Sequence, residues 1–113
     1  MSGTKKLLTV KNPKDFHALL RRGQKTESPF FRVVVNRTSL SNSRFVFVAP
    51  KSVDRRSTKR NVLRRRLREW VRRNPNVFIH PSDFLIFIKK EAAGASRTNF
   101  YEDFKKTLER AAR

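Results

Sequence analysis

The chain has 113 residues, enough for one domain with a single core, and its 28 Lys and Arg against 9 Asp and Glu give a formal net charge of +19. The absence of cysteine excludes disulfides and thiol chemistry, and two histidines are too few for a structural zinc site. No stretch approaches the roughly 18 apolar residues of a membrane span, and the amino terminus lacks the hydrophobic run of a signal peptide. We therefore expect a cytoplasmic protein whose partner is nucleic acid rather than an anionic membrane.

Residues 1–10 are predicted to form a flexible basic arm of this single RNA-binding domain, which spans 1–113. A helix should follow, because Asn12 is a good N-cap, Pro13 suits the first helical position and Asp15 complements the helix dipole. Its apolar stripe consists of Phe16, Leu19 and Leu20. Gly23 follows as the expected C-cap.

Two strands are predicted next, over 29–36 and 43–49, because both segments are rich in β-branched and aromatic residues. Residues 38–42 form the turn between them. Alternation places Phe45, Phe47 and Ala49 on one side of the second strand and Arg44, Val46 and Val48 on the other. Both sides are apolar enough that we expect both to be at least partly covered.

Residues 50–56 are predicted to form a loop, with Asp54 as the cap of a second helix that ends at Asn74-Pro75. On a wheel of 100° per residue, Leu63, Leu67, Trp70 and Val71 fall within one core-facing sector. The opposite side holds Asn61, Arg65, Arg68 and Arg72, with Arg64 at its edge.

This arginine-rich side is the strongest functional signal in the chain. Residues 51–75 carry eleven positive and two negative side chains, and Glu69 can pair with only two of the positive ones, Arg65 and Arg73. A solvated basic face with no ligand is the alternative interpretation. The like charges repel one another, however, so the arrangement costs stability unless a polyanion relieves it, and guanidinium groups bind phosphate bidentately.

A third strand, 83–89, is apolar throughout and is therefore predicted to be central in the sheet. A loop over 91–97 and a last helix over 98–112 follow. The apolar face of that helix consists of Phe100, Phe104, Leu108 and Ala111. The predicted fold class is α+β, a single-domain sandwich in the order helix–strands–helix–strand–helix with one mixed central sheet.

The second helix carries Arg60-Asn61, Arg64-Arg65 and Arg68-Glu69, and the first carries Asp15-Phe16 and ends at Gly23. In this order the motifs resemble the protein subunit of bacterial ribonuclease P over nearly the whole chain. Two features depart from that family. Val62 stands where the family usually has a third arginine, and the loop Lys51-Ser52-Val53-Asp54 lacks the usual Lys-Lys and glycine.

The resemblance implies an accessory subunit of an endoribonuclease that removes the 5′ leader of precursor tRNA. Catalytic RNA and Mg2+, bound mainly by that RNA and the substrate, would perform the hydrolysis, and no protein residue would be catalytic. The partners would be the catalytic RNA, one protein per RNA, and precursor tRNA, with no DNA or membrane. The expected RNA-binding residues are Lys51, Arg55, Arg56, Lys59, Arg60, Asn61, Arg64, Arg65, Arg68 and Arg72.

The resemblance also implies a cleft between the arginine helix and the open face of the sheet that holds the single-stranded leader. Its candidate residues are Phe16, Leu20, Phe31, Phe45 and Phe47, because aromatic rings offer stacking surfaces to unpaired bases. Phe16 matches the family's cleft phenylalanine. For each of the other phenylalanines, a place in the core is the simpler interpretation.

Three other functions remain open from the sequence. A ribosomal or general RNA-binding protein could carry the same basic helix without any role in cleavage. A DNA-binding protein would need the short-turn helix pair that is missing here, since strands flank the arginine helix. A self-sufficient nuclease would need a metal or acid–base cluster, and the sequence offers none.

Overall fold

The computed structural model describes residues 8–75 and 80–112. In chain order the elements are α1 (Pro13–Arg22), β1 (Gln24–Glu27), β2 (Phe31–Arg37), β3 (Arg44–Val48), α2 (Ser57–Arg73), β4 (Ser82–Ile88), the 3-10 helix η2 (Lys90–Gly94) and α3 (Arg97–Ala111). The predicted elements are all present, with bounds that shift by one or two residues. Most of the predicted arm lies outside the described residues. Among the described residues, no helix is both long and apolar enough to cross a membrane.

The four strands form one mixed sheet in the order β1-β2-β4-β3. β1 and β2 are antiparallel, as are β2 and β4, whereas β3 and β4 are parallel. The predicted central position of the third apolar strand, β4, is therefore confirmed. β1 was not predicted, because its four residues, QKTE, are polar and mostly exposed and are held in the sheet only by pairing with β2.

The main core lies between one face of the sheet and the helices α2 and α3. It contains Phe31, Phe84, Ile86, Phe104 and Leu67, each with essentially no exposed surface. The rings of Phe31 and Phe104 lie 5.1 Å apart, and Trp70 of α2 contacts Phe104 edge-on at 5.3 Å. The helices α2 and α3 thus share a single hydrophobic core with the sheet.

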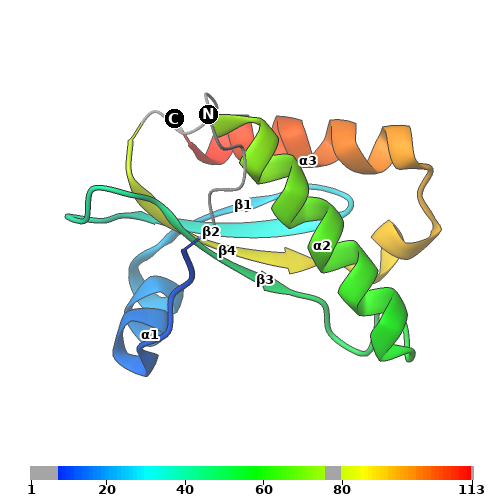
Figure 1. Cartoon of the computed structure of the whole chain (residues 1–113), viewed down its shortest axis with the longest axis horizontal. Helices are drawn as coiled ribbons and strands as arrows, with labels where there is room; N and C mark the ends of the chain where they lie inside the picture. Colours follow the sequence, from blue (N-terminus) through cyan, green and yellow to red (C-terminus); the bar gives the residue numbers. More distant parts are fainter. Residues whose placement is uncertain (1–7, 76–79, 113) are drawn as a thin grey trace, which may run out of the picture.

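A smaller core lies on the opposite face, where α1 packs on β2 and β4. Its buried residues are Leu19, Val34 and Leu85. Figure 1 shows α1 set apart from the pair α2 and α3, with the sheet between them. The two sides of β3 face these two cores, as the alternation predicted, so both faces of the sheet are covered at least in part.

The caps agree with the prediction for α1 and contradict it for α2. The Asn12 side chain accepts a hydrogen bond from the Lys14 amide, and Pro13 occupies the first turn. The N-cap of α2 is Arg56, which makes no side-chain cap hydrogen bond. The prediction that Asp54 caps this helix is wrong. Its carboxylate accepts from the Arg56 amide at 2.9 Å, and Arg56 precedes the first helical residue, Ser57.

Gly23 joins α1 to the sheet by a close approach of two backbones. Its N–H donates to the Leu19 carbonyl, so it is the C-cap that was predicted, but its φ of −68° is one that any residue adopts. A Cβ here would lie 2.4 Å from a Val34 methyl carbon and 2.6 Å from the Leu19 carbonyl oxygen. Glycine is required for space rather than for conformational freedom.

Replacing Gly23→Ala should therefore destabilise the fold, by about 1–3 kcal/mol from overpacking. Gly94→Ala is the matched control, since nothing lies within 4 Å of its Cβ position, and it should change stability by no more than about 0.5 kcal/mol. Urea unfolding followed by circular dichroism measures both. Equal stabilities for the two variants would contradict the close approach.

Leu67→Ala should destabilise the protein by roughly 2–5 kcal/mol, because Leu67 is completely buried at the centre of the α2 stripe. Leu40→Ala is the control at a leucine that is 47% exposed, and it should be close to neutral. The same denaturant titration tests both changes. A Leu67→Ala protein as stable as the wild type would show that α2 does not depend on this stripe for docking.

Candidate nucleic-acid interface

The polar side of α2 forms an exposed basic surface, as the helical wheel predicted. Leu63, Leu67 and Val71 are buried against the sheet. The opposite side consists of Asn61, Arg64, Arg65, Arg68 and Arg72, which we call the arginine face; Asn61, Arg65 and Arg68 are exposed, and Arg64 and Arg72 are half-buried. Burial of the leucine stripe therefore determines which way the arginines point.

Only two hydrogen bonds join side chains of the arginine face to partners on α2. Arg64 donates to the Asn61 side-chain oxygen, and Arg72 pairs with Glu69. The expected pairing of Glu69 with Arg65 and Arg73 is not what the structure has: Glu69 pairs one turn along with Arg72. The eight basic residues of α2 are thus opposed by a single carboxylate within the helix.

Further positive charge gathers where the chain enters α2. Lys51, Arg55, Arg56 and Lys59 are all exposed. Asp54 forms an ion pair with Arg56 at 3.1 Å. The hydrogen bonds that the Arg56 side chain and amide donate to the Asp54 carboxylate lower the pKa of that carboxyl. Because the folded-state pKa is depressed, the pairing persists at neutral pH and is lost only as the pH falls through that lowered value. It holds Arg56 at the first turn of the helix.

A second surface lies on the opposite face of the sheet, beside α1. Phe16, Leu20, Val46, Val48 and Phe87 are half-buried there around the smaller core, and we call them the α1-side patch. Phe16 and Leu20 were predicted for an open cleft and do lie on this surface. The three strand residues were missed; alternation along β3 could have identified Val46 and Val48, but uniformly apolar β4 gives no such signal for Phe87.

Basic residues border the α1-side patch at one end. Since β3 and β4 are parallel, their carboxyl ends lie at the same edge of the sheet, and the chain continues into Lys51 from one and into Lys89 and Lys90 from the other. Arg32 lies opposite Phe87 in the register of β2 and β4. The patch therefore combines apolar surface with a positively charged border.

The other cleft candidates lie elsewhere. Phe31 and Phe45 are buried, 0% and 5% exposed, in the core beneath α2 and α3. The prediction that Phe31 lines an open cleft is therefore wrong, whereas Phe45 borders only a small cavity beside α2. Phe47 is half-buried on that same side, next to α2. The α1-side patch and the arginine helix do not share one cleft, because they lie on opposite faces of the sheet; a smaller cavity, lined in part by Phe45, Phe47 and Arg68, lies between α2 and β3.

Arg44 fixes the position of α1 on the sheet. Its guanidinium meets Asp83, its neighbour on β4, at 2.8 and 2.7 Å, and reaches Asp15 of α1 at 3.3 Å. The hydrogen bonds that Arg44 donates to Asp83 raise the pKa of the Arg44 guanidinium, which is charged at neutral pH. The cluster holds the N-terminal turn of α1 against the sheet edge.

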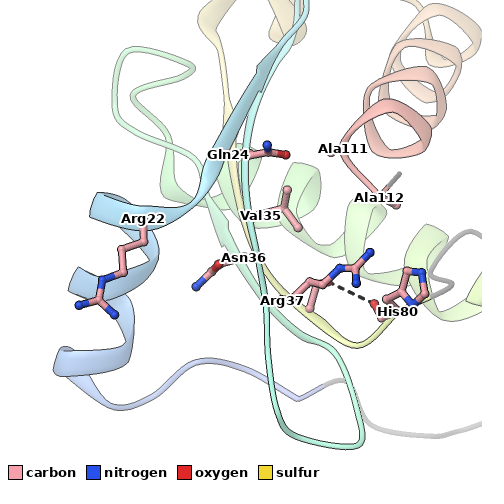
Figure 2. A pocket seen from close by; sticks show the side chains of 9 residues that line it. Arg22, Gln24, Val35, Asn36, Arg37, His80, Ala111 and Ala112 are labelled. Atoms are coloured by element: carbon pink, nitrogen blue, oxygen red, sulfur yellow. Dashed lines mark hydrogen bonds between the residues drawn. The ribbon is translucent and has the colours of Figure 1, made fainter.

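A cavity of about 450 Å³ opens at the end of the sheet where α1, β1, β2 and α3 meet. Figure 2 shows that its two arginines do not converge: the Arg22 side chain extends away along α1, and Arg37 extends towards His80 on the other side of β2. A single anion cannot contact both guanidinium groups in this arrangement. The cavity is not part of either surface described above.

Among residues 8–75 and 80–112, no three His, Asp or Glu side chains come together as metal ligands. Several of the described acidic residues form ion pairs instead, as Glu27 does with Lys89 at 2.7 Å and with Arg32 at 3.3 Å. What the side chains do offer is phosphate binding on the arginine face and base or sugar contact on the α1-side patch.

Comparison with known proteins identifies the family of the chain. The ribonuclease P family model matches residues 4–112. The ribonuclease P protein component of Fusobacterium nucleatum is 30% identical over 102 residues, covering 90% of this chain and 91% of the relative, and that of Aliivibrio salmonicida is 29% identical over 103 residues, covering 91% and 84%.

Solved structures share the fold at lower sequence identity. The Thermotoga maritima RNase P protein superposes with a TM-score of 0.81 at 23% identity, covering 90% of this chain and 96% of that one. The Staphylococcus aureus RNase P protein gives 0.82 at 16%, covering 96% and 100%. Because the family model matches almost the whole of this chain, the chain belongs to the family of ribonuclease P protein components, the protein subunits that partner the ribonuclease P RNA.

Proposed function

We propose that the protein binds the catalytic RNA through the arginine face of α2 and the basic residues before it, and the 5′ leader of precursor tRNA through the α1-side patch. The observation that carries this proposal is the division of the surface by the sheet. One face offers an array of guanidinium groups suited to a folded RNA backbone, and the other offers apolar side chains with a basic border suited to a single strand.

We place the chemistry on the RNA. The described part of the chain brings no three His, Asp or Glu side chains together as metal ligands. The Ser28 hydroxyl donates to the Asp103 carboxylate at 2.7 Å, but it is buried and accepts from the Phe31 amide, which is a structural arrangement. We therefore assign hydrolysis of the phosphodiester to Mg2+ held by the catalytic RNA and the substrate. The role of the protein is to position the leader and to neutralise phosphate charge. One arginine face per chain is consistent with one protein per RNA.

Changing Arg65→Ala together with Arg68→Ala should weaken binding to the catalytic RNA and flatten the dependence of log Kd on log salt, because two phosphate contacts are removed. The fold should be intact, since both side chains are exposed. Filter binding at several salt concentrations measures the effect.

The matched control is Lys105→Ala with Lys106→Ala, which removes the same charge from exposed positions on α3. That variant should keep nearly the full affinity and salt slope. If both double variants lost affinity equally, net charge alone would explain binding, and the assignment of the arginine face would be wrong.

The proposed function as a whole is tested by cleavage of precursor tRNA at a low physiological Mg2+ concentration, with the ribonuclease P RNA of the same genome. Cleavage at the leader junction should accelerate only when RNA and protein are both present. Shortening the leader, or changing Phe16→Ala, should reduce the stimulation through a weaker apparent substrate affinity.

Each other outcome supports a different function. Cleavage by the protein alone would establish a protein nuclease and contradict the placement of the chemistry on RNA. Tight binding to many unrelated RNAs, with no stimulation of cleavage, would support the general RNA-binding or ribosomal alternative.

A further inference from the structure

A small cavity of about 240 Å³ lies between the outer edge of β3 and the helix α2. Its walls come from three parts of the chain: Leu8 and Thr9 of the N-terminal segment, Phe45, Val46 and Phe47 of β3, and Arg64 and Arg68 of the arginine face. No acidic residue lines it. The cavity is therefore continuous with the arginine face but has an aromatic floor, which the rest of that face lacks.

The floor is a half-buried ring presented to a guanidinium. The carbon at the centre of the Arg68 guanidinium lies 5.8 Å from the centroid of the Phe47 ring. Phe47 is itself parallel to Phe45 at 6.1 Å, and Phe45 is parallel to Phe84 at 5.1 Å, so packing in the core fixes the ring plane. Arg68 is exposed, so rotation about its side-chain bonds can admit a flat group between the guanidinium and ring planes.

The edge of β3 adds hydrogen-bonding groups to the cavity. β3 is the last strand of the sheet, and the Phe45 N–H points away from β4, since it donates to the Leu8 carbonyl at 2.9 Å. Residues two apart in a strand direct their backbone groups to the same side. The N–H and C=O of Phe47 therefore also point outward from the sheet, on the side of the N-terminal segment.

These features are those by which proteins hold a single unpaired nucleotide. Unpaired bases of RNA stack on aromatic rings and guanidinium planes, and their edges pair with donors and acceptors. A neighbouring guanidinium, here Arg64, meets the phosphate. An acidic peptide would use the two arginines but would leave the ring face unused.

We propose that the cavity formed by Thr9, Phe47, Arg64 and Arg68 is a nucleotide subsite that takes one unpaired base of the catalytic RNA, stacked on Phe47. The proposal rests on the proposed function, because it names what the arginine face binds besides the phosphate backbone. It assigns to one point of that face a contact that depends on an unpaired base and not only on charge.

The first test compares Phe47→Leu with Phe30→Leu, a half-buried phenylalanine on the same core but remote from the cavity. Phe47→Leu should weaken binding to the catalytic RNA by about 5- to 150-fold, the range expected for the loss of one stacked base, with no change in the salt slope. Phe30→Leu should bind as the wild type does, and thermal unfolding should show comparable folding of both variants. Phe47→Tyr, which keeps the ring, should restore affinity.

The second test locates the base. Dimethyl sulfate probing of the catalytic RNA should show an unpaired adenine or cytosine that the wild-type protein protects and that Phe47→Leu leaves exposed. Thr9→Trp, which fills the cavity from an exposed position without altering the core, should also abolish that protection while phosphate contacts elsewhere remain.

Three results would overturn the subsite. Phe47→Leu and Phe30→Leu could bind equally with the same protections, which would reduce Phe47 to a core residue. The protected base could belong to the tRNA leader, and the assignment of the subsite to the catalytic RNA would then be wrong. If the wild-type protein bound the catalytic RNA no better than unrelated RNAs, the proposed function would fail together with the subsite, and that failure is distinct from a loss confined to Phe47 variants.

Discussion

The strand β4 carries apolar side chains on both of its faces, so helices must pack against both sides of the sheet to shield them from water. Phe84, Ile86 and Ile88 face α2 and α3, while Leu85 faces α1, and all four are essentially inaccessible to solvent. Burial of each such side chain is worth about 1.5–3 kcal/mol. The leucine stripe of α2 is therefore committed to the core, and its arginines must point outward.

A polar cluster complements this apolar constraint. Arg44 and Asp83 are neighbours in the register of β3 and β4, and their side chains are only 16% and 12% exposed. Loss of one partner would leave a largely buried charge uncompensated, which is far more costly than loss of an exposed ion pair. Through Asp15 the same cluster places α1, and so determines how much of the α1-side patch is left open.

The electrostatics of the chain are divided in a similar way. Acidic side chains pair with basic ones at the sheet and around the β1–β2 turn, as with Asp83 and Glu27, but α2 contains a single carboxylate, Glu69. Repulsion among its basic residues is left for a partner to relieve. The sheet separates this charged surface from the α1-side patch, because the two lie on its opposite faces.

Local pattern in the sequence was sufficient for most elements and for the arginine face. Helical periodicity placed Leu63, Leu67 and Val71 opposite Arg65 and Arg68, because a helix with one apolar stripe can face the core in only one way. The caps of α1 follow from Asn12 and Pro13, whose chemistry acts within one turn. The family motifs lie on the same helix and could be recognised for the same reason.

Tertiary structure alone decided which face of the sheet each side chain occupies. Phe16 and Phe45 were both candidates for one cleft, although a core position was the simpler interpretation for Phe45; Phe16 lies beside α1 and Phe45 beneath α2. β1 exists only through pairing with β2, and Gly23 is needed only because Val34 approaches it. The sequence by itself determined the elements and the charge of α2, since these depend on near neighbours; strand order and the packing of helices on each face depend on residues far apart in the chain, and they alone separated the two surfaces.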